Sequence, residues 1–147
     1  MDFHENLIED SAAVREIART ARRVAVLGIK TEQQAGQPSF DIPDYLKGVG
    51  IVVVPVPVYY PEVEQILGQQ VYRKVADVPG EIDVVDVFRR PQDIPQHVED
   101  IIAKKPKAVW FQTGIRNDEA AEQLARAGIK VVQDHCLMVE HRRAGVA

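Results

Sequence analysis

The 147-residue sequence lacks the features that mark several broad classes of protein. Its single cysteine, Cys136, excludes an intramolecular disulfide and a zinc site of four cysteines, and is typical of a reducing compartment. Acidic residues (22) outnumber Lys and Arg (18), and the net charge of −4 argues against a nucleic-acid partner. No apolar stretch approaches the roughly 20 residues that span a bilayer, and no block resembling a signal peptide opens the chain. These absences predict a cytoplasmic protein that does not contact a membrane.

Two fingerprints of nucleotide binding are also missing. The first apolar block is followed by Gly28 and a distant Gly36, so no G-x-G-x-x-G stands there, and no P-loop pattern occurs elsewhere. The second block ends in Pro57-Val58-Tyr59, where a nicotinamide-binding domain has an acidic residue for the ribose hydroxyls. A divergent NAD-type domain therefore stays open only as a disfavoured alternative.

Five short blocks rich in β-branched residues predict five strands. They are continuously apolar, which is typical of parallel strands covered on both faces. The blocks are Val24–Leu27, Ile51–Val54, Val84–Phe88, Ala108–Phe111 and Lys130–Val132.

Amphipathic or capped segments separate the blocks and predict helices. These segments are Ser11–Thr20, Pro38–Lys47 (with a later start allowed by Pro43), Glu62–Leu67, Gln92–Lys104, Asn117–Ala127 and Leu137–Arg143. The alternation predicts a Rossmann-like α/β fold with a doubly wound, five-stranded parallel sheet in the order 3-2-1-4-5 and helices on both faces. We expect residues 1–147 to form one domain, with residues 1–22 as an N-terminal helix packed on it.

In such a sheet, ligands bind beyond the carboxyl ends of the strands where the strand order reverses, here predicted between the first and fourth strands. Gly28 and Gly114 follow these two strands, and Pro38-Ser39 begins a helix whose free N–H groups suit an anion. Lys30 and Arg89 offer positive charge nearby, as do Arg90 and Arg116. The pattern predicts that the backbone amides at the two glycine turns face one crevice and receive a pyrophosphate.

An ordered set of motifs between about Arg23 and Arg143 resembles the small CoA-binding proteins, which are similar to the N-terminal CoA-binding domain of the succinyl-CoA synthetase α subunit. The matching stretches are Val24–Gly28, Pro38-Ser39, Tyr45-Leu46, Val54–Val56, Leu67-Gly68, Val71-Tyr72, Val75–Pro79, Asp83–Phe88, Val109–Ile115 and Val131–Arg143. The resemblance implies that CoA adenosine and phosphates lie against Gly28, Ser39, Val56, Phe88 and the turn Thr113–Ile115.

The chain departs from that family at the ligand contacts. The basic residue expected after the second strand is absent at Pro57-Val58-Tyr59, Lys30 replaces a small hydroxyl residue, Gln37 replaces an arginine, and the first loop is about two residues longer. With these departures included, the predicted cofactor-binding residues are Gly28, Ile29, Lys30, Ser39, Val56, Pro57, Phe88, Arg89, Thr113, Gly114 and Ile115.

The main functional hypothesis is a non-catalytic module that binds coenzyme A or an acyl-CoA. The alternative is an enzyme of thiol exchange or acyl transfer that uses Cys136, which is flanked by His135 and lies near a predicted helix N-terminus. The histidine spacing does not predict a metal site. A homodimer or another protein partner stays open.

Overall fold

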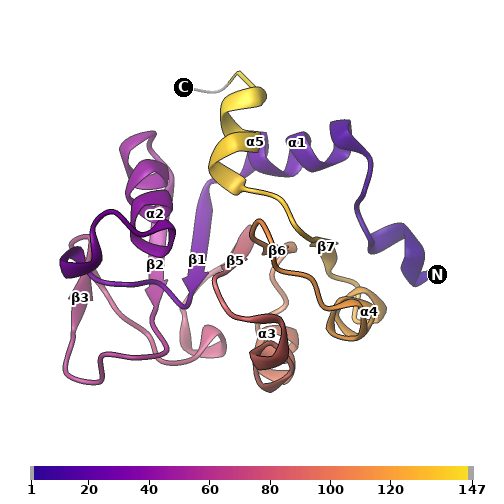
Figure 1. The fold of residues 1–147 in the computed structure, drawn as a ribbon. Helices are drawn as coiled ribbons and strands as arrows, with labels where there is room; N and C mark the ends of the chain where they lie inside the picture. The colour runs from indigo at the N-terminus through magenta and orange to yellow at the C-terminus, as the bar shows by residue number, and fades with distance from the viewer. Residues whose placement is uncertain (1, 146–147) are drawn as a thin grey trace.

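A parallel five-stranded sheet forms the centre of the protein in a computed structural model, which describes residues 2–145. Its strands are β1 (Arg23–Leu27), β2 (Val52–Val56), β5 (Val84–Val87), β6 (Ala108–Phe111) and β7 (Lys130–Val132). Every pairing in this sheet is parallel, and helices cover both faces (Figure 1). The predicted Rossmann-like α/β fold is confirmed.

The strand order corrects one detail of the prediction. The strands lie in the order β2-β1-β5-β6-β7, so the third strand along the chain, β5, is the neighbour of β1. The order 3-2-1-4-5 placed the fourth strand there and is wrong in this respect. The burial pattern gives the physical reason: all four β5 residues are buried, as a central strand requires, whereas Val52 of the edge strand β2 is 49% exposed.

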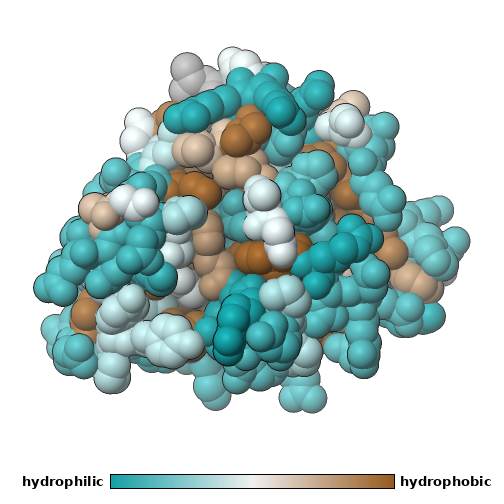
Figure 2. Space-filling model, viewed as in Figure 1, coloured by the Kyte–Doolittle hydropathy of each residue, from teal (hydrophilic) through white to brown (hydrophobic). Residues whose placement is uncertain are grey.

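The helices divide into two layers (Figure 1). One face of the sheet packs against α1 (Ser11–Thr20), α2 (Pro38–Gly48) and α5 (Leu137–Arg143), and the other against α3 (Val98–Lys104) and α4 (Asp118–Arg126). Val14 and Ala18 of α1 are buried in the hydrophobic core of the first layer. No helix within residues 2–145 is long and apolar enough to cross a membrane. Hydrophilic residues cover most of the face in Figure 2.

Two predicted helices differ from the structure. Residues 62–67 are not helical, because Leu67 and Gly68 both have positive φ and close a short antiparallel ribbon of β3 (Gln65–Ile66) and β4 (Gln69–Gln70). The helix expected from Gln92 begins only at Val98. Its first part forms 3₁₀ turns at Pro91–Asp93 and Pro95–His97, each opened by a proline. Further 3₁₀ turns span Phe3–Asn6, Glu32–Gln34 and Val75–Asp77.

Pro43 lies inside α2, which nevertheless begins at Pro38. A proline has no N–H, so it leaves the carbonyl four residues earlier without its helical partner. That carbonyl belongs to Ser39, and it accepts a hydrogen bond from the Lys30 N–H at 3.1 Å. The proline thus ties the first turn of α2 to the loop that follows β1.

Candidate functional site

A crevice opens at the carboxyl ends of β1 and β5. From β1 the chain crosses to β2 through α2 on one face, and from β5 it crosses to β6 through α3 on the other, so the winding reverses between β1 and β5. A cavity of about 460 Å³ lies at this point. Its lining residues are Gly28, Lys30, Gln37, Pro38, Ser39, Tyr59, Phe88, Arg89, Arg90, Pro91, Gly114 and Ile115. The site therefore lies between the first and third strands along the chain, whereas the sequence predicted a site between the first and fourth.

Gly28 shapes one wall of the crevice because no other residue fits its position. Its φ is +88°, and an added Cβ would lie 2.3 Å from the Phe88 carbonyl oxygen. The close approach joins the end of β1 to the end of β5. The Gly28 N–H donates to the Val56 carbonyl at 2.9 Å, so this amide is already paired.

Gly114 also lines the crevice, and its N–H is paired as well. It donates to Asp134 Oδ1 at 2.6 Å, and Asp134 has the unusual φ of +58°. Both glycines line one cavity, as expected, but neither offers a free amide. In this structure these two amides are therefore not free to receive a pyrophosphate.

The Ser39 amide, at the same cavity, is still available. Ser39 is the second residue of α2, where backbone N–H groups have no partner inside the helix. Within residues 2–145 no hydrogen bond engages the Ser39 N–H. The eleven-residue α2 adds the partial positive charge of its N-terminus, so the first turn of the helix suits an anionic ligand.

Three cations surround the same space. Arg90 pairs with Asp93 at 2.8 Å, whereas Lys30 and Arg89 form no ion pair within the described part of the chain. Lys30 Nζ instead donates to the side-chain carbonyl of Gln37. Among residues 2–145, no acidic residue lines the cavity. The crevice thus has positive charge that no protein carboxylate neutralises.

Arg89 is held by two neighbours. Its Nε donates to His97 Nε2 at 3.1 Å, and its Nη1 lies 3.4 Å from the Tyr59 hydroxyl. Burial, together with the positive charge of Arg89, lowers the pKa of His97, which favours the neutral imidazole that this hydrogen bond requires. The guanidinium is therefore oriented before any ligand arrives.

Tyr59 is a lining residue that the sequence analysis did not select. It was noted only for the missing basic side chain after the second strand, yet its ring borders the cavity and its side chain meets Arg89. Positive charge at this place comes instead from Arg89, which follows β5 on the other side of β1. The sequence signal was indirect: an aromatic residue standing where the family pattern has a cation.

The predicted residues separate into two groups. Those that line the cavity are Gly28, Lys30, Ser39, Phe88, Arg89, Gly114 and Ile115. Ile29, Val56 and Pro57 are instead buried at the ends of their segments, and Thr113 is exposed outside the lining.

The side chain of Asp86 is buried near the C-terminal end of β5. Asp86 of β5 is fully buried on the face covered by α1, α2 and α5, and its Oδ1 accepts from Gln112 Nε2 at 2.6 Å. Its Oδ2 has no partner. Burial raises the pKa of Asp86 to about 7, against the opposing effect of the Gln112 hydrogen bond. An acidic residue inside an apolar strand was the available sequence signal.

Cys136 is half-buried at the N-cap of α5 and does not line the crevice. Beside it, His135 Nδ1 lies 3.5 Å from the buried carboxylate of Glu140, which Arg143 also approaches at 3.2 Å. The contact between His135 and Glu140 links the segment before α5 to the helix itself. Among residues 2–145, no group of three or more His, Cys, Asp or Glu side chains is arranged to hold a metal ion.

With this geometry established, the class of protein follows from a family comparison. The model of the CoA binding domain family matches residues 22–142, which include the whole sheet and every residue that lines the crevice. The chain belongs to the CoA-binding domain family.

Two relatives of similar length match most of the chain. The uncharacterized protein YneT of Bacillus subtilis is 28% identical over 130 residues, covering 88% of this chain and 93% of its own length. The structure of cell-free ID.343 from Thermus thermophilus has a TM-score of 0.82 and 34% identity, covering 92% of this chain and 99% of that chain. A dinucleotide forming acetyl-coenzyme A synthetase 1 from Ca. Korarchaeum cryptofilum, solved with phosphate and ADP, is similar in fold alone. Its TM-score is 0.64 and its identity 21%, and the match covers 80% of this chain but 27% of that one.

Proposed function

We propose that this protein binds coenzyme A or an acyl-CoA in the crevice between β1 and β5, as a binding module without chemistry of its own. The observation that carries the proposal is the meeting of Lys30, Arg89 and the unpaired Ser39 N–H at one cavity that no acidic residue lines. Phosphate groups satisfy all three through charge-assisted hydrogen bonds. The family of the chain narrows the phosphorylated ligand to CoA.

The cavity volume supports the same proposal. At about 460 Å³ it falls within the usual range for small-molecule sites, roughly 300–1,000 Å³. It is large enough for the phosphorylated part of the ligand, and the open rim leaves a path to solvent for the pantetheine arm.

Thermal unfolding in the presence of candidate ligands tests the proposal. CoA at 100 times its dissociation constant should stabilise the folded protein by about 2.7 kcal/mol and raise its Tm, because it binds only the native state. Adenosine 3′,5′-bisphosphate should compete with it. A Tm unchanged by CoA and acyl-CoA but raised by NAD would instead support the divergent NAD-type alternative.

A thiol-release assay tests the enzyme alternative. Cys136 lies outside the crevice lining, so we propose no catalytic role for it. Purified protein incubated with CoA disulfide should release no CoA thiol beyond the rate seen with the Cys136→Ser variant. Release that depends on Cys136 would overturn the non-catalytic part of the proposal.

A further inference from the structure

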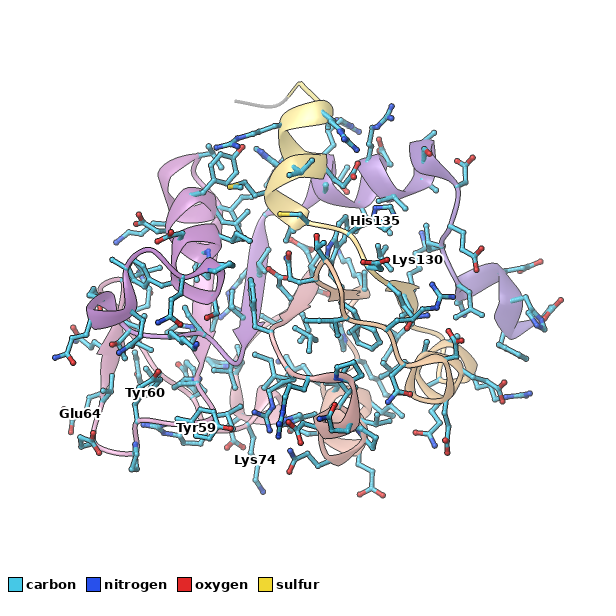
Figure 3. All side chains as sticks on the ribbon, viewed as in Figure 1. Tyr59, Tyr60, Glu64, Lys74, Lys130 and His135 are labelled. Atoms are coloured by element: carbon cyan, nitrogen blue, oxygen red, sulfur yellow. The ribbon has the colours of Figure 1, made fainter. Side chains whose placement is uncertain are left out.

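Tyr59 presents an aromatic ring to solvent at the rim of the crevice. Its side chain is 60% exposed, although a ring of this size is normally more buried in a folded protein. It lies on the loop after β2, next to Tyr60 (Figure 3). The ring also borders the cavity that Lys30 and Ser39 line.

The backbone that carries Tyr59 is fixed despite this exposure. The Arg73 guanidinium donates to the carbonyls of Tyr59 at 3.1 Å, Tyr60 at 2.9 Å and Val63 at 2.8 Å. The Tyr72 N–H also donates to the carbonyl of Pro55 in β2 at 3.0 Å. These contacts hold the loop through its backbone, and the Tyr59 ring stays largely exposed, with the Tyr60 ring packed edge-on against it at 6.4 Å between centroids.

The position of Arg89 gives the ring a chemical context. The guanidinium carbon is 5.7 Å from the ring centroid, and Nη1 reaches the hydroxyl at 3.4 Å, while His97 holds Nε on the other side. A cation therefore lies over a ring whose residue is still 60% exposed. A ligand that carries a planar base beside a phosphate can satisfy both at once.

We infer that Tyr59 is the stacking platform for the adenine ring of the ligand, with Arg89 binding an adjoining phosphate. This inference rests on the proposed CoA function and adds the residue that selects the nucleotide half of the molecule. Stacking on one tyrosine face is tolerant of lateral shifts, which suits a site at an open rim. A ligand that lacks a base gains no affinity from stacking on Tyr59.

Equilibrium titrations of three ligands test the inference: CoA, adenosine 3′,5′-bisphosphate and 4′-phosphopantetheine, which lacks the adenine. Tyr59→Ala should weaken the first two about tenfold, the order of magnitude of one base–aromatic stack, and change the third by less than about twofold. Tyr59→Phe keeps the ring and should retain the wild-type difference between adenine-bearing ligands and 4′-phosphopantetheine, although it loses the hydroxyl that Arg89 approaches at 3.4 Å. Val52→Ala is the matched control, because Val52 is also strongly exposed but lies at the opposite end of β2.

A second variant gives a direct readout. Trp110 is the single tryptophan and is fully buried, so Tyr59→Trp adds an exposed indole whose fluorescence reports on the rim. Adenosine 3′,5′-bisphosphate should quench it and 4′-phosphopantetheine should not.

The outcomes separate the two proposals. If the wild type binds CoA and Tyr59→Ala binds it equally well, the stacking role is wrong and the CoA function stands. Equal losses for all three ligands would show that Tyr59 only positions Arg89, which also overturns stacking. If the wild type binds none of the three, the CoA function itself fails.

Discussion

Two of the hollows on this protein are similar in size but differ in charge. The crevice between β1 and β5 has a volume of about 460 Å³, and a second hollow at the β7 edge has about 420 Å³. The second is lined by the acidic residues Glu9, Asp118, Glu122 and Asp134, with Arg116 as its one lysine or arginine. Arg116 pairs with Asp118 at 3.1 Å. The first has no acidic lining residue and two cations without a carboxylate partner.

The difference teaches that cavity size does not identify the anion site here. A cation already paired with a carboxylate must lose that partner before it can bind a phosphate. Lys30 and Arg89 have no such partner to lose, whereas Arg116 does. The predictions below test this contrast, from the largest expected effect to the smallest.

Gly28→Ala should damage the crevice most severely. The new methyl would clash with the Phe88 carbonyl at 2.3 Å in a left-handed conformation, so we expect a loss of roughly 3–5 kcal/mol in the free energy of unfolding and loss of CoA binding. Gly114→Ala is the matched control: its φ is +81° but no atom lies within 4 Å, so only about 1–2 kcal/mol should be lost. Urea denaturation measures both. Equal losses would contradict the structural role given to Gly28.

Asp86→Asn should alter the pH dependence of stability. The folded-state pKa of Asp86, about 7, lies above the unfolded value of 3.8, so the native state holds the proton longer and stability falls as pH rises between these values. Relative to wild type, the variant should therefore gain up to roughly 4 kcal/mol between pH 4 and pH 7. Urea denaturation across this range checks it. Parallel stability curves for the two proteins would show that the Asp86 carboxyl is ionised in the fold.

Lys30→Gln and Arg89→Gln should each weaken CoA binding about tenfold, because each removes a charge-assisted hydrogen bond to phosphate. Arg116→Gln, at the β7-edge hollow, should leave the affinity within about twofold of wild type. Isothermal titration at one fixed salt concentration compares them. A larger effect from Arg116 than from Arg89 would reverse the assignment of the two hollows.

Cys136→Ser should have the smallest effect. Cys136 lies outside both hollows, so the affinity for CoA should stay within about twofold of wild type. Loss of binding in this variant, with an unchanged Tm, would place the thiol in the ligand site.

The sequence predicted the elements better than their arrangement. Apolar blocks located all five strands to within a residue or two, because burial on both faces leaves a continuous pattern. The same pattern did not predict the order of the strands. All five blocks are mainly apolar, so a central strand and an edge strand look alike in the sequence. Only the acidic Asp86 inside one block distinguished β5.

The sequence predicted the parts of the site that depend on local features, and missed those that depend on contacts between distant segments. Gly28 was identified because a glycine at a strand end signals close approach, and its geometry agrees. The pairing of the Gly114 N–H with Asp134, twenty residues later, was invisible to local reasoning. Tyr59 was missed because an exposed aromatic side chain acquires meaning only from Arg89, which reaches it from another strand.

The structure of the protein crystallised with CoA tests the central claim most directly. The account predicts phosphate oxygens within hydrogen-bonding distance of the Ser39 N–H and of the Lys30 and Arg89 side chains, with the β7-edge hollow empty of ligand. Phosphates bound at Arg116 and His135 instead, or on no part of the β1–β5 crevice, would contradict it.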